Sequence, residues 1–168
     1  MAIYFLGDIQ GCYEEFNQLL EKIKFDQSTD ELWIAGDMIA RGADSLATMK
    51  LILSLGDSVK AVLGNHDLHF LATNAGLFKV KRKDNLSNLI ESPELPDIIE
   101  WMKKQPLVRK LPGENVYMSH AGLPPQWTPE IALHQSQKAH ELISAENNVE
   151  NLQNMYGNKP SNWLAANT

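Results

Sequence analysis

The sequence predicts an α/β sandwich with a largely parallel sheet, in which short buried strands alternate with helices. Three observations lead to this expectation. Four short apolar runs stop at small residues, as buried strands do. Segments with helical periodicity lie between these runs. The chain has 168 residues, of which 43% are hydrophobic. This is enough for a packed core, and we expect one domain over residues 1–168.

Each expected strand leads directly into residues that can bind a metal ion. The strands are expected over residues 2–6, 31–35, 59–63 and 115–118. The motifs that follow them are Gly7-Asp8, Gly36-Asp37, Gly64-Asn65-His66-Asp67 and Ser119-His120. Ligands gather at the carboxyl ends of the strands in sheets of this kind, so we expect the four loops to meet at one rim.

Helices are expected in the connections between these strands, because apolar residues recur there on one helical face. Ser45 is expected to cap the second of them. Proline just after a Ser or Thr marks the start of two later helices. The helices are expected over residues 13–23, 46–55 and 68–75, from Ser92-Pro93 to near Lys104, and from Thr128-Pro129 onward.

Charge and composition exclude several classes of protein. The formal net charge is −6, whereas a nucleic-acid-binding module is expected to carry a basic excess. Cys12 is the one cysteine, so no internal disulfide can form and a reducing, cytoplasmic compartment is expected. No apolar run approaches the roughly 18 residues that a bilayer span needs. The first residues do not form a secretory signal. We therefore expect neither a nucleic acid nor a membrane as partner.

The four motifs have an alternative interpretation. Asp and Asn after Gly at a strand end are common in turns, because both side chains bond their own backbone and tolerate a left-handed conformation. For any single loop, the turn is the more frequent explanation. Metal-capable residues in all four loops together favour a metal site.

Together the motifs are similar to the four leading signatures of the calcineurin-like metallophosphoesterases. Within that superfamily the chain most resembles the bacterial symmetrical diadenosine tetraphosphatases. The supporting segments are residues 63–71, 105–107, 121–127 and 155–163. The resemblance implies a metallophosphoesterase-like β-sandwich flanked by helices. It also implies symmetrical hydrolysis of diadenosine tetraphosphate to two ADP, by attack of metal-bound hydroxide.

The resemblance also implies the metal ligands. Asp8 corresponds to a ligand of a first metal ion and Asp37 to a carboxylate that bridges two ions. Asn65 and His120 correspond to ligands of the second ion. Oxygen and nitrogen ligands without thiolate favour Mn²⁺, Co²⁺ or Fe as the divalent ions.

Three further residues are candidates for contact with the substrate. The resemblance places His66 beside the leaving group and Arg41 on a phosphate. His69 lies three residues after His66 on the same helical face, so it is either a substrate contact or a structural histidine. The expected partner is a dinucleoside polyphosphate. Because the chain carries a charge of −6, the metal ions and Arg41 must reverse the sign of the charge locally.

Two residues depart from the pattern of the superfamily. Gln10 stands where many members have a metal-binding His, and either coordinates the first metal or orients a neighbouring group. Ala40 stands where the related protein phosphatases have an Asp that orients the catalytic His. ADP leaves through a phosphate with a second pKa near 6 and needs little help from a general acid. Ala40 therefore favours anhydride hydrolysis, with Asp67 or Asp44 as alternative orienting groups.

A third departure concerns the end of the chain. The superfamily continues with further strands and a Gly-His segment whose His completes the second metal site, and no His follows His140 here. We expect a fragment, a frameshifted product or a naturally short relative, without the C-terminal strands. Two alternative functions stay open: a serine/threonine-type protein phosphatase, and a catalytically impaired protein that binds nucleotides. The oligomeric state is not predicted.

Overall fold

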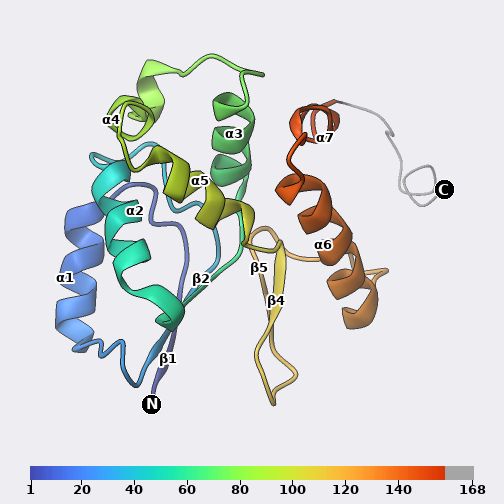
Figure 1. Cartoon of the computed structure of the whole chain (residues 1–168). Coiled ribbons are helices and arrows are strands. Elements are labelled where there is room, and N and C mark those ends of the chain that lie inside the picture. The colour runs from blue at the N-terminus through green and yellow to red at the C-terminus, as the bar shows by residue number, and fades with distance from the viewer. Residues whose placement is uncertain (158–168) are drawn as a thin grey trace.

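A three-stranded parallel sheet forms the centre of the molecule (Figure 1). The computed structural model describes residues 1–157, so residues 158–163 of the last family-like segment lie outside the described part. The sheet consists of β1 (Ile3–Leu6), β2 (Glu31–Ile34) and β3 (Val59–Ala61), in that order across the sheet. These are the first three strands that the sequence predicts, each shorter by one or two residues.

Two helices cover one face of this sheet. They are α1 (Tyr13–Ile23), between β1 and β2, and α2 (Ser45–Ser54), between β2 and β3. The connections between neighbouring parallel strands are right-handed as a rule, and the order β1-β2-β3 then places both helices on the same side. They pack against each other (Figure 1). Side chains alternate along β2, so that Leu32 and Ile34 enter the main core.

The last predicted strand does not belong to the parallel sheet. It is β5 (Tyr117–Ser119), and it pairs in antiparallel orientation with β4 (Val108–Lys110), a strand that the sequence analysis did not predict. Only six residues separate β4 from β5. Such a connection suits a hairpin, whereas a parallel pairing needs a crossover of a dozen residues or more. The fourth predicted strand therefore lies in a hairpin outside the parallel sheet.

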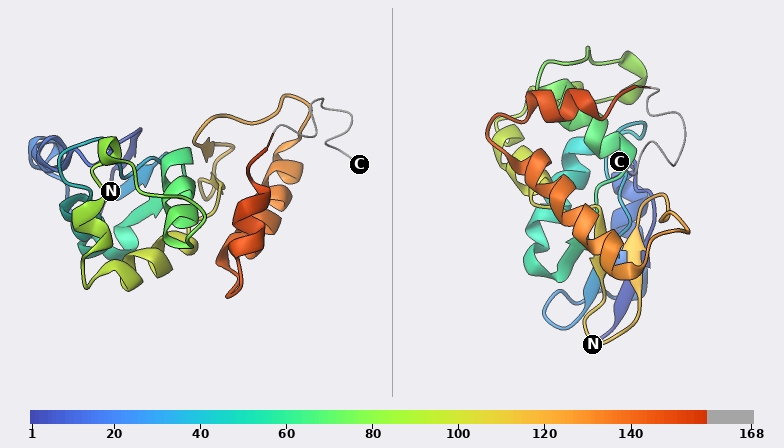
Figure 2. Two further views of the ribbon diagram at one scale, coloured as in Figure 1. Left: turned by 90° about the horizontal axis from the view of Figure 1, so that it is seen from above. Right: turned by 90° about the vertical axis from the view of Figure 1, so that its right-hand side faces the viewer.

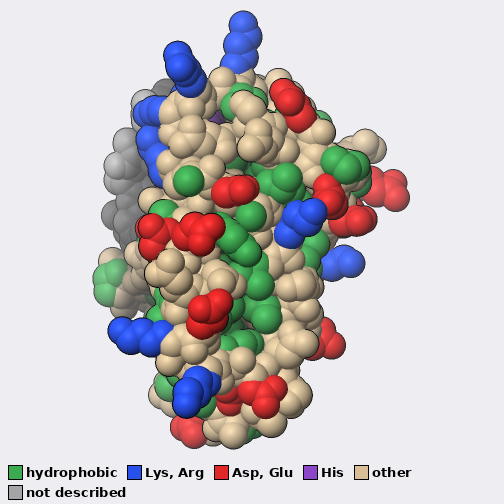
Figure 3. Space-filling model, turned by 90° about the vertical axis from the view of Figure 1, so that its left-hand side faces the viewer, with side chains coloured by type: hydrophobic (Ala, Val, Ile, Leu, Met, Phe, Trp, Pro, Cys, Tyr) green, Lys and Arg blue, Asp and Glu red, His purple; other side chains and the backbone are tan. Residues whose placement is uncertain are grey.

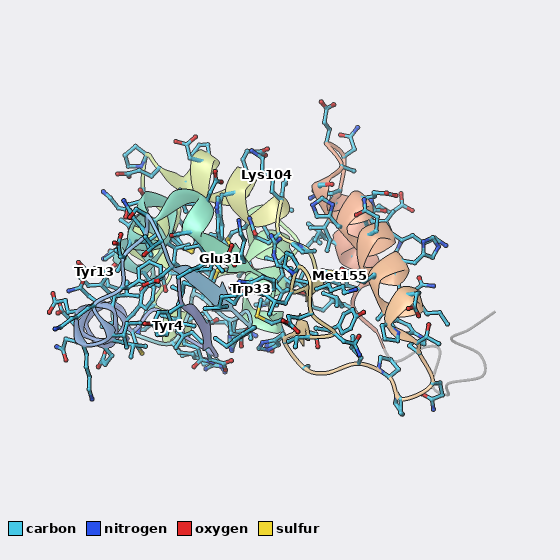
Figure 4. The ribbon with its side chains drawn as sticks, turned by 90° about the horizontal axis from the view of Figure 1, so that it is seen from below. Tyr4, Tyr13, Glu31, Trp33, Lys104 and Met155 are labelled. Atoms are coloured by element: carbon cyan, nitrogen blue, oxygen red, sulfur yellow. The ribbon has the colours of Figure 1, made fainter. Side chains whose placement is uncertain are left out.

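The hairpin packs on the second face of the parallel sheet. Met118 of β5 forms a small buried cluster with Trp33 and Val62, which point away from the main core. Arg109 ties β4 to β3, because its Nε donates to the Ala61 carbonyl oxygen at 2.7 Å. Trp33 Nε1 donates to the Glu31 carboxylate at 2.8 Å, and both residues are labelled in Figure 4. The two sheets thus form the sandwich that the family resemblance implies.

The remaining helices surround the carboxyl ends of the strands and the hairpin. Figure 2 shows the last two beside the rest of the molecule, connected to β5 by a long loop. One of these two packs on β4 and the other on the helix that follows β3. Two short 3₁₀ segments cover Gly56–Ser58 and Arg82–Asp84. The helices are α3 (Asn65–Asn74), α4 (Ser87–Ile90), α5 (Leu95–Lys103), α6 (Pro129–Ser144) and α7 (Val149–Asn154).

Three helix starts differ from the prediction. Asp44, not Ser45, caps α2, because its side chain accepts from the Ala47 N–H at 2.9 Å. Helix α5 begins at Leu95 rather than after Ser92-Pro93, with Pro96 in its first turn, where a missing N–H is tolerated. Helix α3 begins at Asn65, three residues earlier than expected.

The start of α6 agrees with the sequence. The Thr128 side chain accepts from the Ile131 N–H, and Pro129 is the first helical residue.

On the side of the molecule that carries α1, opposite α6, hydrophobic side chains form a band between acidic and basic residues (Figure 3). No helix within residues 1–157 is both long and apolar enough to cross a membrane.

Candidate metal centre

Asp8 lies in the loop after β1 and points into the rim formed by the strand ends. Its side chain is about half exposed, and Gln10 Nε2 donates to its Oδ2 at 3.3 Å. The backbone N–H groups of Ile9 and Gln10 both donate to the Asp37 carbonyl oxygen. These bonds join the first loop to the second. Gln10 thus contacts a candidate ligand through its amide nitrogen.

Asp37 is the buried carboxylate of the site, with 3% of the residue exposed. It lies directly after β2, at a positive φ of 50°. Its Oδ1 accepts from the His66 N–H at 2.8 Å. His66 belongs to the first turn of α3, so the positive end of that helix faces the carboxylate and compensates for its burial.

Asp67 holds the second and third loops together. This residue is fully buried, and its two oxygens accept from the N–H groups of Asp37 at 2.8 Å, Gly64 at 2.9 Å and Met38 at 3.0 Å. Burial raises the pKa of Asp67 to about 7, although the hydrogen bond from the Gly64 N–H acts to lower it. Asp67 is therefore a positioning residue that fixes the backbone beneath the site.

This geometry overturns the suggestion that Asp67 or Asp44 orients His66. The carboxylate of Asp67 is bonded to backbone groups, and that of Asp44 caps α2. Sequence reasoning missed this role of Asp67. The signal that could have found it is the spacing, because Asp67 lies three residues after Gly64, the residue that caps α3. An acidic side chain at that position accepts from the backbone N–H of the capping residue.

The glycines of the motifs permit the close approach of the loops. A Cβ atom on Gly64 would collide with the side chain and backbone N of Asp37. Gly36, at a φ of 88°, faces the backbone of Gly64 in the same way. By contrast, a Cβ atom on Gly7 would meet nothing. The second and third loops therefore need glycine at Gly36 and Gly64 for this contact, whereas position 7 of the first loop does not need it.

His120 follows β5 and brings the hairpin into the site. Its Nδ1 lies 2.8 Å from the Ala35 carbonyl oxygen, which requires the proton on Nδ1. Nε2 then faces the site, 3.1 Å from Asn65 Oδ1 and 3.6 Å from Asp37 Oδ1. A carbonyl oxygen that fixes the other ring nitrogen is typical of metal-binding histidines.

These side chains form a set that fits a divalent cation. Asp8, Asp37 and His120 each offer one ligand atom, and the three atoms lie within 4.8 Å of one another. Asn65 adds an amide group beside His120 Nε2. Several acceptor atoms thus face one point, an arrangement that a cation stabilises. The structure brings together all four residues predicted as ligands.

His66 lies beside this set, whereas the side chain of Arg41 contacts Asp84. His66 Nε2 is 4.0 Å from Asp37 Oδ2, and its side chain is largely covered. Arg41 is 44% exposed in its side chain, and one guanidinium nitrogen lies 3.8 Å from Asp84 Oδ1. The roles of His66 and Arg41 on the substrate stay predictions.

His69 is held by two aromatic residues. Its Nδ1 lies 3.1 Å from the Tyr156 hydroxyl, and its ring centre is 5.0 Å from that of Phe78. Partial burial and the nearby charge of Lys81 lower the pKa of His69. These contacts favour the structural alternative for His69 over the substrate contact.

Backbone strain is concentrated in the same loops. Gln10, Asp37, Ala40 and Arg41 all have positive φ angles, between 49° and 73°. Such conformations cost about 1–3 kcal/mol each for residues other than glycine and persist where the surrounding structure enforces them. Strain of this kind gathers at functional sites, and no residue pattern predicts it at Ala40 or Arg41.

Comparisons with known proteins agree with this geometry. A profile of the family described as calcineurin-like phosphoesterase matches residues 1–166. A symmetrical bis(5′-nucleosyl)-tetraphosphatase of Shewanella baltica (strain OS155) is 46% identical over 164 residues, which cover 97% of this chain and 60% of that protein. The protein of the same name from Colwellia psychrerythraea is 42% identical, over 99% of this chain and 63% of its own length.

Solved structures resemble the fold. The crystal structure of a candidate diadenosine tetraphosphatase matches with a TM-score of 0.64 and 32% identity, over 76% of this chain and 53% of its own. A cold-active protein-tyrosine phosphatase of a psychrophilic Shewanella matches with a TM-score of 0.66 at 20% identity, over 96% of this chain and 56% of its own. The second likeness concerns the fold alone. The chain spans about three fifths of the length of the curated relatives.

Proposed function

The chain belongs to the calcineurin-like phosphoesterase family, and from this premise we propose that it hydrolyses diadenosine tetraphosphate symmetrically to two ADP. The observation that carries the proposal is the convergence of Asp8, Asp37, Asn65 and His120 on one point, from loops far apart in the sequence. The names of the relatives, at 42–46% identity over almost the whole of this chain, support this substrate class.

The family uses a centre of two divalent metal ions, and the acceptor atoms of this site suit such ions. In our proposal Asp8, Asp37, Asn65 and His120 hold the ions, and Gln10 orients Asp8. Mn²⁺ and Co²⁺ are the ions we propose, because the ligands are oxygen and nitrogen atoms without thiolate. When bound, the ions supply an activated water and positive charge for the phosphates.

Arg41 and the start of α3 complete the phosphate site. The guanidinium of Arg41 carries a permanent charge in a fork that suits phosphate oxygens, and its pairing with Asp84 at 3.8 Å leaves nitrogen donors available. Helix α3 begins at Asn65, so its positive end also favours an anion there. These groups offset the long-range repulsion between a chain of charge −6 and a polyanion.

His66 is proposed to contact the leaving group. Its ring lies beside Asp37 at the margin of the site, and its backbone N–H holds that carboxylate. Ala40, at the position of the orienting Asp of protein phosphatases, is buried and donates its N–H to Ser45 Oγ at 3.0 Å. A weakly oriented His66 is sufficient when the leaving group is a nucleoside diphosphate, which departs without full protonation.

Product analysis tests the proposal. The chain is incubated with diadenosine tetraphosphate and Mn²⁺ or Co²⁺, and the nucleotides are separated by chromatography. We expect ADP alone, and its loss in His120→Ala. His134→Ala, an exposed substitution on α6, is the matched control and should keep the activity.

Other outcomes contradict the proposal in distinguishable ways. ATP together with AMP would exclude symmetrical cleavage. Release of phosphate from phosphoserine peptides, with the dinucleotide intact, would favour a protein phosphatase. Binding of the dinucleotide without turnover would favour the impaired nucleotide-binding protein.

A further inference from the structure

A cavity of about 500 Å³ lies beside the candidate metal centre. It separates α6 from the ends of β3, β4 and β5. Asn65 and His120 form part of its wall, so the cavity and the metal centre share two residues. A molecule whose phosphates occupy the metal centre therefore has this cavity immediately next to it.

The wall of the cavity is apolar. None of the described residues that line it is Asp, Glu, Lys or Arg. Leu68 of α3, Leu107 before β4, and Leu123 and Trp127 after β5 supply much of its surface. A phosphate would lose its hydration here without compensation, whereas an uncharged aromatic ring would be stabilised.

The volume of the cavity and its few polar groups limit further which kind of molecule can bind there. The volume lies within the range of small-molecule sites, which are mostly apolar with a few polar groups. Trp127 supplies an aromatic face of the kind on which bases stack. Gln135 supplies an amide with both donors and an acceptor. Ser136 Oγ accepts from the N–H groups of Leu107 and Val108, so it fixes the wall.

We propose that this cavity binds the base and ribose of one nucleoside of the substrate, while the adjoining phosphates occupy the metal centre. The inference rests on the proposed function in taking the substrate to be a nucleotide. It explains how a site built around phosphate ligands would select a nucleoside polyphosphate over an inorganic polyphosphate or a phosphopeptide. In this proposal the selectivity comes from the apolar wall of the cavity, to which α6 and the segment before it contribute.

A substitution that fills the cavity tests the proposal. Ala139 of α6 lines the cavity, whereas the neighbouring Lys138 is exposed and does not. Ala139→Leu narrows the cavity, and Lys138→Leu introduces the same side chain on the solvent side as the matched control. Both variants and the original chain are titrated by calorimetry in Mn²⁺ with ADP, adenosine and pyrophosphate.

We expect Ala139→Leu to weaken the binding of ADP and adenosine by about tenfold or more, and to change that of pyrophosphate by less than about twofold. Lys138→Leu should leave the binding of all three unchanged. Trp127→Ala gives a second measurement if Ala139→Leu alters the fold. It should weaken ADP binding by about tenfold through the loss of one stacking contact, and Trp127→Phe should restore most of that binding.

The results separate this inference from the proposed hydrolysis. If both cavity variants bind ADP and adenosine as the original chain does, the nucleoside site is wrong, even where the dinucleotide is cleaved. If adenosine binds in the cavity and no dinucleotide is cleaved, the nucleoside site stands and the proposed reaction is wrong.

Discussion

Asp67 shows how a single buried carboxylate can organise a site without entering it. Three backbone N–H groups from two loops converge on its oxygens. In Asp67→Asn, the amide nitrogen faces N–H donors that it cannot accept from. We expect this variant to lose about 2 kcal/mol or more of the free energy of unfolding, measured by urea denaturation.

The exposed Asp57→Asn is the matched control for this prediction, because a surface substitution of this kind changes stability by less than about 0.5 kcal/mol. If Asp67→Asn were as stable as this control, the three hydrogen bonds would not hold the loops together.

His66 allows a second prediction at the scale of one residue. If it assists departure of the leaving group, its contribution grows as that group becomes more basic. We expect His66→Gln to slow the hydrolysis of diadenosine tetraphosphate by at most about tenfold. Across a series of aryl and alkyl phosphates, the loss should rise toward about 100-fold or more for the most basic leaving group.

The measurement is kcat for each substrate, with His134→Gln of α6 as the control. A loss that is equal for every leaving group would assign the His66 ring to the support of Asp37, whose Oδ2 lies 4.0 Å from its Nε2, rather than to the leaving group.

At the scale of elements, the loops after β2 and β3 act as one unit. Gly64 contacts Asp37 so closely that a methyl group cannot be added, while Gly7 after β1 faces open space. We therefore expect Gly64→Ala to displace the Asp37 carboxylate and to weaken Mn²⁺ binding, with a stability loss of about 1–3 kcal/mol.

Gly7→Ala, which makes the same change in the first motif, should retain both Mn²⁺ affinity and stability. Calorimetric titration with Mn²⁺ and thermal unfolding of the two variants make the comparison. Equal behaviour of the two variants would mean that the close approach of the loops is not required for the site.

At the scale of the whole molecule, metal binding and stability are coupled. The candidate ligands come from both sheets and from α3, so an ion that they share joins elements that are otherwise connected by loops. A ligand present at 100 times its dissociation constant stabilises the folded state by about 2.7 kcal/mol. For a chain of this size, this corresponds to a rise of roughly 5–10 °C in the Tm.

Thermal unfolding with Mn²⁺, and again after addition of a chelator, measures this effect. We expect the rise to disappear in His120→Ala and to persist in His134→Ala. A full rise in His120→Ala would show that the hairpin contributes nothing to the metal centre.

The sequence alone determined the elements that local patterns encode. Short apolar runs identified β1–β3, helical periodicity identified α1 and α2, and Thr128-Pro129 identified the start of α6. The motifs after the strands identified Asp8, Asp37, Asn65 and His120. Such patterns depend on neighbouring residues, so they can be recognised without knowledge of the fold.

The tertiary structure decided what depends on contacts between distant segments. It placed β5 in a hairpin, assigned Asp67 to backbone groups of two loops, and favoured a structural role for His69 beside Phe78 and Tyr156. It also opened the cavity beneath α6. The physical reason is that strand partners, buried hydrogen bonds and empty volume are properties of pairs of surfaces, and no single stretch of sequence contains both members of the pair.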